Sequence, residues 1–428
     1  MIDLLIHDAA EVVTLSAAAV AEEAGAAASA LPRRGPGQGA LGRVRQGFVA
    51  VRGGRILGAG PMRSLPREWR RAREEVDARG RAVLPGFVDP HTHVVYAGDR
   101  MEEYVLRVGG ASYEELARRG GGILATVEAT RRASADELAE AARPRLGRML
   151  AAGTTTAEVK SGYGLRLEDE RKILETVRRL GREQPVELVP TFLGAHELPP
   201  EWRGRPGGEE AYAAEVAGPM LEAVVREGLA RSVDVFLERG VFGRASARRV
   251  LEAGRAAGLL LRLHADQLSG EMGGAELAAE LRVRAADHLE HASRAGLEAM
   301  AAAGVAAVLL PGATLLLGSP PAPARAMVEL GVPVALGTDS NPGSSPLESQ
   351  AVAMGLACAL LRLTPAEALV AATLNAAWVL GLEGRLGSLE PGKQADLLLL
   401  EEPTYLAVPY RLGSNLVRAV WKAGRRVA

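Results

Sequence analysis

The chain has 428 residues, and its 51 lysines and arginines nearly balance its 52 aspartates and glutamates, so the formal net charge is −1. This balance argues against nucleic acid or an anionic membrane as the partner, because both attract an excess of basic side chains. One cysteine excludes an intramolecular disulfide and a cysteine-based zinc site, and the lack of a signal segment or of an uncharged apolar run of ~20 residues predicts a cytoplasmic protein without a membrane span.

The first part of the chain predicts a small β-rich region. Residues 2–6 form a short apolar run, and residues 48–59 have the pattern of a strand, a Gly-Gly turn and a second strand. Between them, residues 17–46 are rich in alanine, glycine, arginine and proline without amphipathic order, so we expect a loop or a partly disordered insertion. The hairpin-like region continues to about Val83 and is expected to lack a core of its own.

Residues 84–100, with the sequence LPGFVDPHTHVVYAGDR, begin as an apolar strand and change character at two histidines. His91 and His93 are two positions apart, so in an extended chain both side chains point to the same side. Two imidazoles on one side of a strand end can bind a single metal ion. Asp89 and Pro90, directly before the pair, strengthen this interpretation.

After the histidine pair, helical and strand patterns alternate. Residues 134–137 have the spacing of a capping box and predict a helix that ends before Gly153. Further helices are expected near 167–180, 208–227 and 274–281, and one is expected to end near residue 258. With the strand that leads to His91, the predicted strands are 154–160, 186–192, 233–236, 259–264, a short one ending at 288, 305–310 and 332–338. Eight strands, each followed by helical sequence, are typical of an α/β fold of the (β/α)8 TIM-barrel type, here over residues 83–384.

Polar side chains stand where most of these strands end. They are His91 and His93, Lys160 and Tyr163, His196, His264, His288 and Asp339. In such barrels the carboxyl ends of the strands carry the active site. We therefore expect these side chains to meet in one site.

The end of the chain returns to strands. Residues 364–367 form another capping box, with proline at the first helical position. Residues 395–400 and 417–421 then predict strands for which the barrel has no position left. We expect them to join the N-terminal hairpin in one small β-sandwich-like domain made of residues 1–82 and 385–428.

Three histidines and an aspartate offer ligands suited to one Zn²⁺ or one iron ion, Fe²⁺ or Fe³⁺. These predicted metal ligands are His91, His93, His264 and Asp339. Four protein ligands leave room for a water molecule, and a metal ion lowers the pKa of a bound water toward neutrality. Asp339 is the predicted acceptor of that proton, and His288 is predicted to polarise the substrate or to move a proton.

The other basic residues have weaker interpretations. Some related barrels use a modified lysine to bridge two metal ions, but Lys160 follows the second strand, and one metal ion explains the ligand count. A buried ion-pair partner is therefore the favoured interpretation of Lys160. His7 and His291 are interpreted as structural or surface residues.

Several motifs resemble the amidohydrolase superfamily and, within it, the imidazolonepropionase family. The superfamily likeness rests on His91-Thr-His93 and on Thr338-Asp339 after the eighth strand. The narrower likeness spans residues 82 to 395 and rests on HTHVVYAGDR, GGGI at 120–123, TTTAEVKSGYGL, TFLGAHELP, HADQ, ADHLEH and TDSNPGSS. This resemblance implies hydrolysis of the cyclic amide C–N bond of 4-imidazolone-5-propanoate, which gives N-formimidoyl-L-glutamate in histidine degradation.

The resemblance also implies which residues contact the substrate. Arg100 would bind a carboxylate through two parallel hydrogen bonds. Gln267 stands where several related deaminases have a proton-transferring glutamate; glutamine cannot take a proton, so Gln267 would orient the substrate during catalysis. The remaining substrate-binding residues implied are Tyr163, His196, Asn341, Gly343 and Ser344.

Two other classes of protein remain open at this stage. The first is another mononuclear amidohydrolase, either a cytosine- or guanine-type deaminase or a cyclic amidase. Arg100 together with Tyr163 favours a substrate with an acidic side chain instead. The second is a non-catalytic barrel that serves as an assembly scaffold, although such a barrel is expected to lack some metal ligands. The sequence leaves open whether the chain forms a homodimer.

Overall fold

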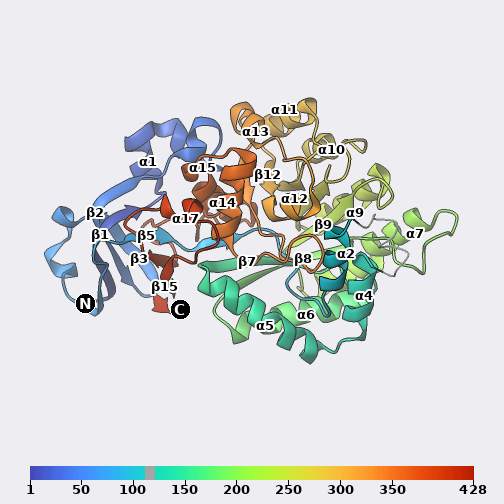
Figure 1. The fold of residues 1–428 in the computed structure, drawn as a ribbon, viewed down its shortest axis with the longest axis horizontal. Helices are drawn as coiled ribbons and strands as arrows, with labels where there is room; N and C mark the ends of the chain where they lie inside the picture. The colour runs from blue at the N-terminus through green and yellow to red at the C-terminus, as the bar shows by residue number, and fades with distance from the viewer. Residues whose placement is uncertain (111–120) are drawn as a thin grey trace.

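The computed structural model describes residues 1–110 and 121–428. It consists of a β/α barrel and a separate β sheet that both chain ends build (Figure 1). This arrangement confirms the predicted fold class. Gly120, the first residue of the GGGI motif, lies outside the described residues.

The composite sheet joins strands from the two ends of the chain. β14 pairs antiparallel with β5, with Leu398 opposite Leu84, and both termini lie at this end of the molecule (Figure 1). The sequence analysis placed the domain boundary at residue 82. The sheet extends past this residue, since its strand β5 ends at Pro85. Its strands are β1 (Ile2–Val13), β2 (Arg43–Arg52), β3 (Arg55–Pro61), β4 (Ala72–Asp77), β5 (Ala82–Pro85), β14 (Leu397–Leu400), β15 (Val417–Lys422) and β16 (Arg425–Arg426).

The N-terminal strands have an apolar cluster of their own, so the prediction that this region lacks a core is wrong. Alternate residues of β2 enter different clusters because successive side chains of a strand point to opposite faces. Phe48 and Ala50 pack with Ile2, Leu5 and Leu65, all from the N-terminal part. The intervening valines of β2 pack in a second cluster, which the C-terminal strands share.

Residues 17–46 are not a loop, and the prediction of a loop or partly disordered insertion is wrong. The segment contains helix α1 (Ala17–Ala24) and two short 3-10 turns, Ala26–Ser29 and Gly35–Gly39. The Ser16 hydroxyl accepts a hydrogen bond from the Ala19 amide and thereby caps the helix. The buried Gln38 side chain donates to the Val334 carbonyl at 2.8 Å and accepts from the Val334 amide at 3.2 Å. These contacts attach the insertion to the last barrel strand.

The barrel contains the eight parallel strands that the sequence predicted, and each lies next to its neighbour in chain order. The strands are short and almost wholly buried, as strands covered on both faces must be. They are β6 (Phe87–Asp89), β7 (Thr154–Lys160), β8 (Glu187–Ala195), β9 (Ser232–Leu237), β10 (Leu260–Ala265), β11 (Ala285–His288), β12 (Ala306–Leu309) and β13 (Val334–Leu336).

Helices surround the strands. Both predicted capping boxes are present, formed by Ser134 with Glu137 and by Thr364 with Glu367. The helix expected over 208–227 is interrupted at Gly218, directly before Pro219, because proline cannot donate the helical hydrogen bond and disfavours a helical backbone in the residue before it. The helices are α2 (Met101–Val108), α4 (Ile123–Arg132), α5 (Ala135–Ala151), α6 (Leu167–Glu183), α7 (Gly208–Glu215), α8 (Leu221–Arg226), α9 (Arg244–Ala256), α10 (Gly274–Glu280), α11 (Arg294–Ala303), α12 (Pro311–Leu317), α13 (Ala324–Leu330), α14 (Gln350–Leu361), α15 (Pro365–Ala371), α16 (Leu374–Val379) and α17 (Ala407–Tyr410).

Side chains join the first and last barrel strands. The buried Gln350 amide donates to the Val88 carbonyl of β6 at 3.0 Å and to the Leu336 carbonyl of β13 at 2.8 Å. The Thr338 hydroxyl donates to the Asp89 carboxylate at 2.6 Å. We call these contacts the barrel seam. The seam matters for the site, because His91 follows β6 and Asp339 follows β13.

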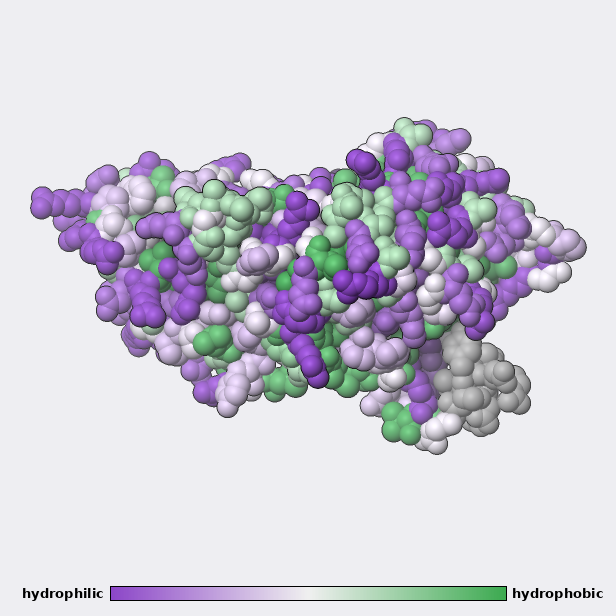
Figure 2. Space-filling view, turned by 90° about the horizontal axis from the view of Figure 1, so that it is seen from above, coloured by the Kyte–Doolittle hydropathy of each residue, from purple (hydrophilic) through white to green (hydrophobic). Residues whose placement is uncertain are grey.

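Hydrophilic and apolar residues are interspersed over the face drawn in Figure 2. Within residues 1–110 and 121–428, none of the helices combines the length and apolar character that a bilayer crossing requires.

Candidate active site

A cavity of about 400 Å³ opens at the carboxyl ends of the barrel strands. Its volume is in the range of small-molecule sites, which span roughly 300–1,000 Å³. Most of the predicted site residues line it: His93, Arg100, Tyr163, His196, His264, Gln267, His288, Asp339, Asn341, Gly343 and Ser344. His91 is fully buried beside this lining. The structure therefore brings together the residues that the sequence placed at separate strand ends.

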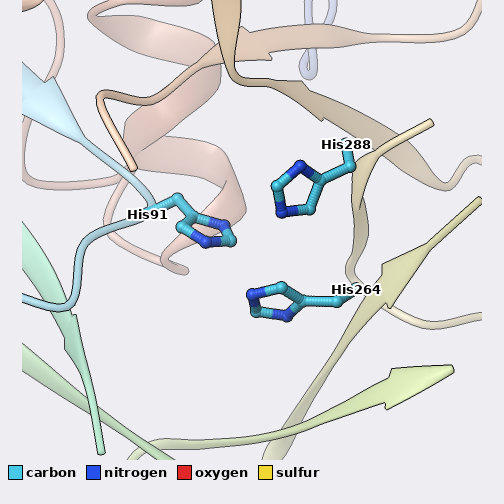
Figure 3. A group of neighbouring side chains, drawn as sticks. All are labelled: His91, His264 and His288. Carbon is cyan, nitrogen blue, oxygen red and sulfur yellow. The ribbon is translucent and has the colours of Figure 1, made fainter. Parts of the chain in front are cut away.

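Three histidines from different strands face one another (Figure 3). His91 follows β6, His264 is in β10 and His288 ends β11. The ring centres of His91 and His264 are 4.6 Å apart, and those of His264 and His288 are 5.3 Å apart. One nitrogen of each ring lies within 4.8 Å of the others, so the three rings could share one metal ion.

The other predicted ligands belong to overlapping groups. His91, His93 and Asp339 form a second group, in which an Asp339 oxygen is 3.4 Å from His91 Nε2 and 3.6 Å from His93 Nε2. His93, His196 and His264 form a third, with the rings of His93 and His196 stacked at 5.0 Å. No single group in the described chain holds all four predicted ligands. His196 and His288, for which other roles were predicted, also have nitrogens within reach of a metal ion.

Two backbone hydrogen bonds, in addition to the barrel seam, hold the segment after β6 beside the segment after β13. The Asp339 amide donates to the His91 carbonyl at 2.9 Å, and the His93 amide donates to the Ser340 carbonyl at 2.9 Å. His288 and Asp339 have φ angles of 77° and 53°. Such positive angles cost a residue other than glycine roughly 1–3 kcal/mol and concentrate at functional sites.

The donor atoms fit a metal cation. Burial, with the positive charge of Lys160 and of neighbouring histidines, holds the pKa of His91 well below its ordinary value. Burial also lowers the pKa of His93, so both rings are neutral, the form that binds metal. Nε2 of His91 and Nε2 of His264 are buried with no hydrogen-bond partner among the described residues, which is unusual for buried polar atoms. Burial raises the pKa of Asp339, and a bound cation would oppose that rise.

Buried charges lie beneath the histidines. Lys160 Nζ donates to Glu158 at 2.9 Å and to Asp234 at 2.7 Å, and all three side chains are fully buried. The neighbouring carboxylates outweigh the effect of burial and raise the pKa of Lys160. The prediction that Lys160 is a buried ion-pair partner is confirmed.

Two arginines also line the cavity. Arg100 Nε donates to the Glu103 carboxylate at 2.8 Å, and Arg107 Nη1 donates to the Gly343 carbonyl at 3.3 Å. Glu103 and Arg107 were not predicted from the sequence, although both line the cavity. They follow Arg100 by three and seven residues, which places them on the face of α2 next to Arg100, but charged residues at this spacing are also usual on a solvated helix.

The remaining predicted site residues differ in whether their polar groups are already hydrogen-bonded within the chain. Burial raises the pKa of Tyr163, so its phenol stays neutral and can donate a hydrogen bond. The Asn341 side chain is already bonded within its own turn: its amide group donates to Ser344 Oγ at 2.9 Å, and its oxygen accepts from the Gly343 amide at 2.8 Å. His7 bonds Asp8 on β1, and His291 is exposed. Neither of these two histidines lines the cavity.

Comparison with known proteins agrees with this site. The Amidohydrolase family model matches residues 82–427. An imidazolonepropionase of Symbiobacterium thermophilum is 49% identical over 430 residues, which cover 100% of this chain and 97% of that protein. An imidazolonepropionase of Geobacillus kaustophilus is 49% identical over 390 residues, or 90% of this chain and 91% of that protein.

Solved structures show the same fold at lower identity. An adenosine deaminase from Xanthomonas campestris, with bound zinc, has a TM-score of 0.70 and 21% identity, covering 99% of this chain and 92% of that one. A triazine hydrolase variant has a TM-score of 0.71 and 17% identity, covering 99% of this chain and 94% of that one.

The match to the family model and the histidine-aspartate groups together support a divalent metal ion in this cavity. The enzyme class that they indicate is a hydrolase. By the match of the family model and the identity to curated relatives over nearly the full chain, this protein belongs to the amidohydrolase family and, within it, to the imidazolonepropionases.

Proposed function

We propose that the protein hydrolyses the cyclic amide C–N bond of 4-imidazolone-5-propanoate to N-formimidoyl-L-glutamate, a step of histidine degradation. The observation that carries this proposal is the 49% identity to an imidazolonepropionase over the full chain. The cavity supports it, because candidate metal ligands and Arg100 line the same cavity. A substrate that combines a cyclic amide with a carboxylate matches these two features.

We propose His91, His93, His264 and Asp339 as the ligands of one metal ion, either zinc or iron. The neutral, buried imidazoles and the buried carboxyl group suit both metals. When bound, the metal ion would supply Lewis acidity and make a water molecule more acidic. No residue of this set has sulfur, so the donors are nitrogen and oxygen.

Proton handling falls to two residues of the chain. Asp339 lies between the histidines and the Asn341–Ser344 turn, where its carboxylate can accept a proton from the attacking water. Asp339 can then pass this proton to the leaving nitrogen, while His288 can donate a hydrogen bond to the ring carbonyl oxygen. Gln267 lines the same cavity and can orient the ring, but a glutamine amide cannot carry a proton at neutral pH.

Recognition of the propanoate group requires a cation in the cavity. Arg100 is the proposed partner of the carboxylate, since a guanidinium binds a carboxylate through two parallel hydrogen bonds. Tyr163 and His196 also line the cavity and can donate to the ring. Gly343 allows close approach: a Cβ there would lie 1.9 Å from Arg100 Nη1. Asn341 and Ser344 line the cavity as well.

The test is a direct assay with three candidate substrates. Purified protein with its metal content measured by elemental analysis is offered imidazolone propanoate, cytosine and guanine. We expect ring opening of the imidazolone, loss of turnover after chelation and recovery with zinc or iron. Turnover of a base without ring opening of the imidazolone would refute the proposal.

A further inference from the structure

Five charged side chains are fully buried directly beneath the histidines. They come from four barrel strands: Glu158 and Lys160 from β7, Asp234 from β9, Arg262 from β10 and Asp287 from β11. Burial of so many charges is costly unless each is paired. None of these five residues has a role in the proposed chemistry, so their presence requires another explanation.

Two of the buried carboxylates contact the proposed metal ligands. Asp287 Oδ2 is 2.8 Å from His91 Nδ1, and Asp234 Oδ2 is 3.0 Å from His264 Nδ1, the latter outside good hydrogen-bond alignment. In both rings the opposite nitrogen, Nε2, is buried without a partner in the described chain. A carboxylate at Nδ1 keeps the proton on that nitrogen and leaves Nε2 free to bind metal, an arrangement common around metal sites.

Lys160 contacts both of these carboxylates. Its Nζ is 2.7 Å from Asp234 Oδ2 and 3.4 Å from Asp287 Oδ2, the same two oxygens that approach the histidines. Its backbone amide donates to the Thr92 carbonyl, between the two histidines of the pair, at 2.9 Å. Arg262 holds Asp287 from the other side, with Nη2 at 2.8 Å from both of its oxygens.

A cation so close to a metal site would ordinarily weaken metal binding. Here the two cations face three carboxylates, so the cluster presents an excess of negative charge to the histidines. The ammonium group of Lys160 can form several hydrogen bonds at once, and it fixes the oxygens that orient His91 and His264. By holding these oxygens in place, Lys160 favours metal binding, and this effect opposes its direct electrostatic repulsion of the metal ion.

We propose that Lys160 is a positioning residue of the metal site: it fixes Asp234 and Asp287, which in turn fix the ring orientation and the Nδ1–H tautomer of His264 and His91. This inference rests on the metal ligands of the proposed function. It does not depend on the identity of the substrate.

The experiment measures zinc affinity in a double-mutant cycle without substrate. Lys160→Met, Asp234→Asn and the double variant are compared with the unmodified chain by competition with a chromogenic chelator. We expect each single variant to bind zinc roughly 10–100-fold more weakly. Because Lys160 acts through Asp234, the loss in the double variant should be smaller than the product of the two single losses. The visible spectrum of the Co²⁺-loaded variants should also change, which a distant structural defect would not cause.

The chain offers a matched control. Asp396 pairs with Lys422 at 2.7 Å in the composite sheet, the same distance as in the Lys160–Asp234 pair. Asp396→Asn should change stability and leave zinc affinity unaltered. If Lys160→Met fails to fold, Asp287→Asn, which keeps both buried cations, tests the same claim through His91.

Two results would overturn the inference: zinc binding by folded Lys160→Met or Asp287→Asn that equals the unmodified chain, or fully multiplicative losses in the cycle. Imidazolone turnover is measured separately. A chain that binds zinc as described but does not open the imidazolone ring would refute the proposed function and leave the role of Lys160 standing.

Discussion

Arg100 and Glu103 form an ion pair inside the cavity, with Arg100 Nε donating to Glu103 Oε2 at 2.8 Å. The two residues are one helical turn apart, and the pair is largely shielded from solvent. Arg100 is the proposed partner of the substrate carboxylate, so Glu103 holds the position that this carboxylate would take. Substrate and Glu103 therefore compete for one guanidinium.

Replacing Glu103 with glutamine should strengthen substrate binding. The amide oxygen can still accept the Gly122 amide, which now bonds Glu103 Oε2 at 2.8 Å, but the charge that competes for Arg100 is gone. An ion pair of this kind is worth about 1 kcal/mol, or about a fivefold change in affinity. We expect KM to fall about fivefold with kcat unchanged, measured by steady-state kinetics.

The control for this variant is Arg100→Leu, which should raise KM strongly whether or not Glu103 is charged. A Glu103→Gln variant whose KM is unchanged or higher would show that the two carboxylates do not compete.

Gly343 should be intolerant of a side chain. A Cβ at this position would lie 1.9 Å from Arg100 Nη1, so Arg100 must move away in Gly343→Ala. Losing a hydrogen-bonded charge pair costs about 1.5–3 kcal/mol, which corresponds to a KM increase of roughly 10–100-fold. Gly384→Ala is the control, because no atom lies within 4 Å of a Cβ at residue 384. Equal KM values for the two variants would contradict the prediction.

The sequence predicted the parts of the site that lie at strand ends. Strand β7 runs from Thr154 to Lys160, as its unbroken β-prone pattern predicts, and His264 and Asp339 lie at or just past the ends of their strands. Strands buried on both faces have a continuous apolar pattern, and a polar residue at the end of such a pattern stands out. The barrel geometry then brings these ends together.

Other parts could not be predicted in this way. Glu103 and Arg107 belong to a helix after the strand, where a charged side chain is an ordinary surface residue by pattern alone. Asp234 lies inside a strand, and its role depends on Lys160 and His264, which are distant in sequence. The Gln38 contact with Val334 joins residues 296 positions apart. Such contacts depend on packing between segments, about which local pattern carries no information.

The stability of the barrel seam should depend on Gln350. Gln350 is fully buried and donates to carbonyls of both β6 and β13. Gln350→Leu leaves two buried carbonyls without this donor, which should lower the free energy of unfolding by about 2–5 kcal/mol. Urea unfolding followed by circular dichroism measures this loss. Ser349→Ala removes only the adjacent helix cap and should cost about 1 kcal/mol; equal losses would contradict the special role of Gln350.

Glu290 should make the protein less stable as the pH rises toward neutrality. Burial raises the pKa of this carboxyl group from 4.5 to about 7, and its Oε2 has no hydrogen-bond partner among the described residues. Between these two pH values the folded chain binds more protons at Glu290 than the unfolded chain, so stability falls as pH increases and levels off above about 7. The shift corresponds to about 3 kcal/mol.

Glu290→Gln isolates this contribution, because the amide can keep the contact with the Thr314 hydroxyl, now 2.9 Å from Glu290 Oε1, and cannot ionise. We expect urea unfolding between pH 5 and pH 8 to show a decline in the unmodified chain that is smaller in the variant by up to about 3 kcal/mol. Other groups that titrate in this range contribute equally to both proteins, so the difference between the two curves belongs to Glu290. Parallel curves would mean that Glu290 ionises in the folded chain at its ordinary pKa, despite its burial beside His288.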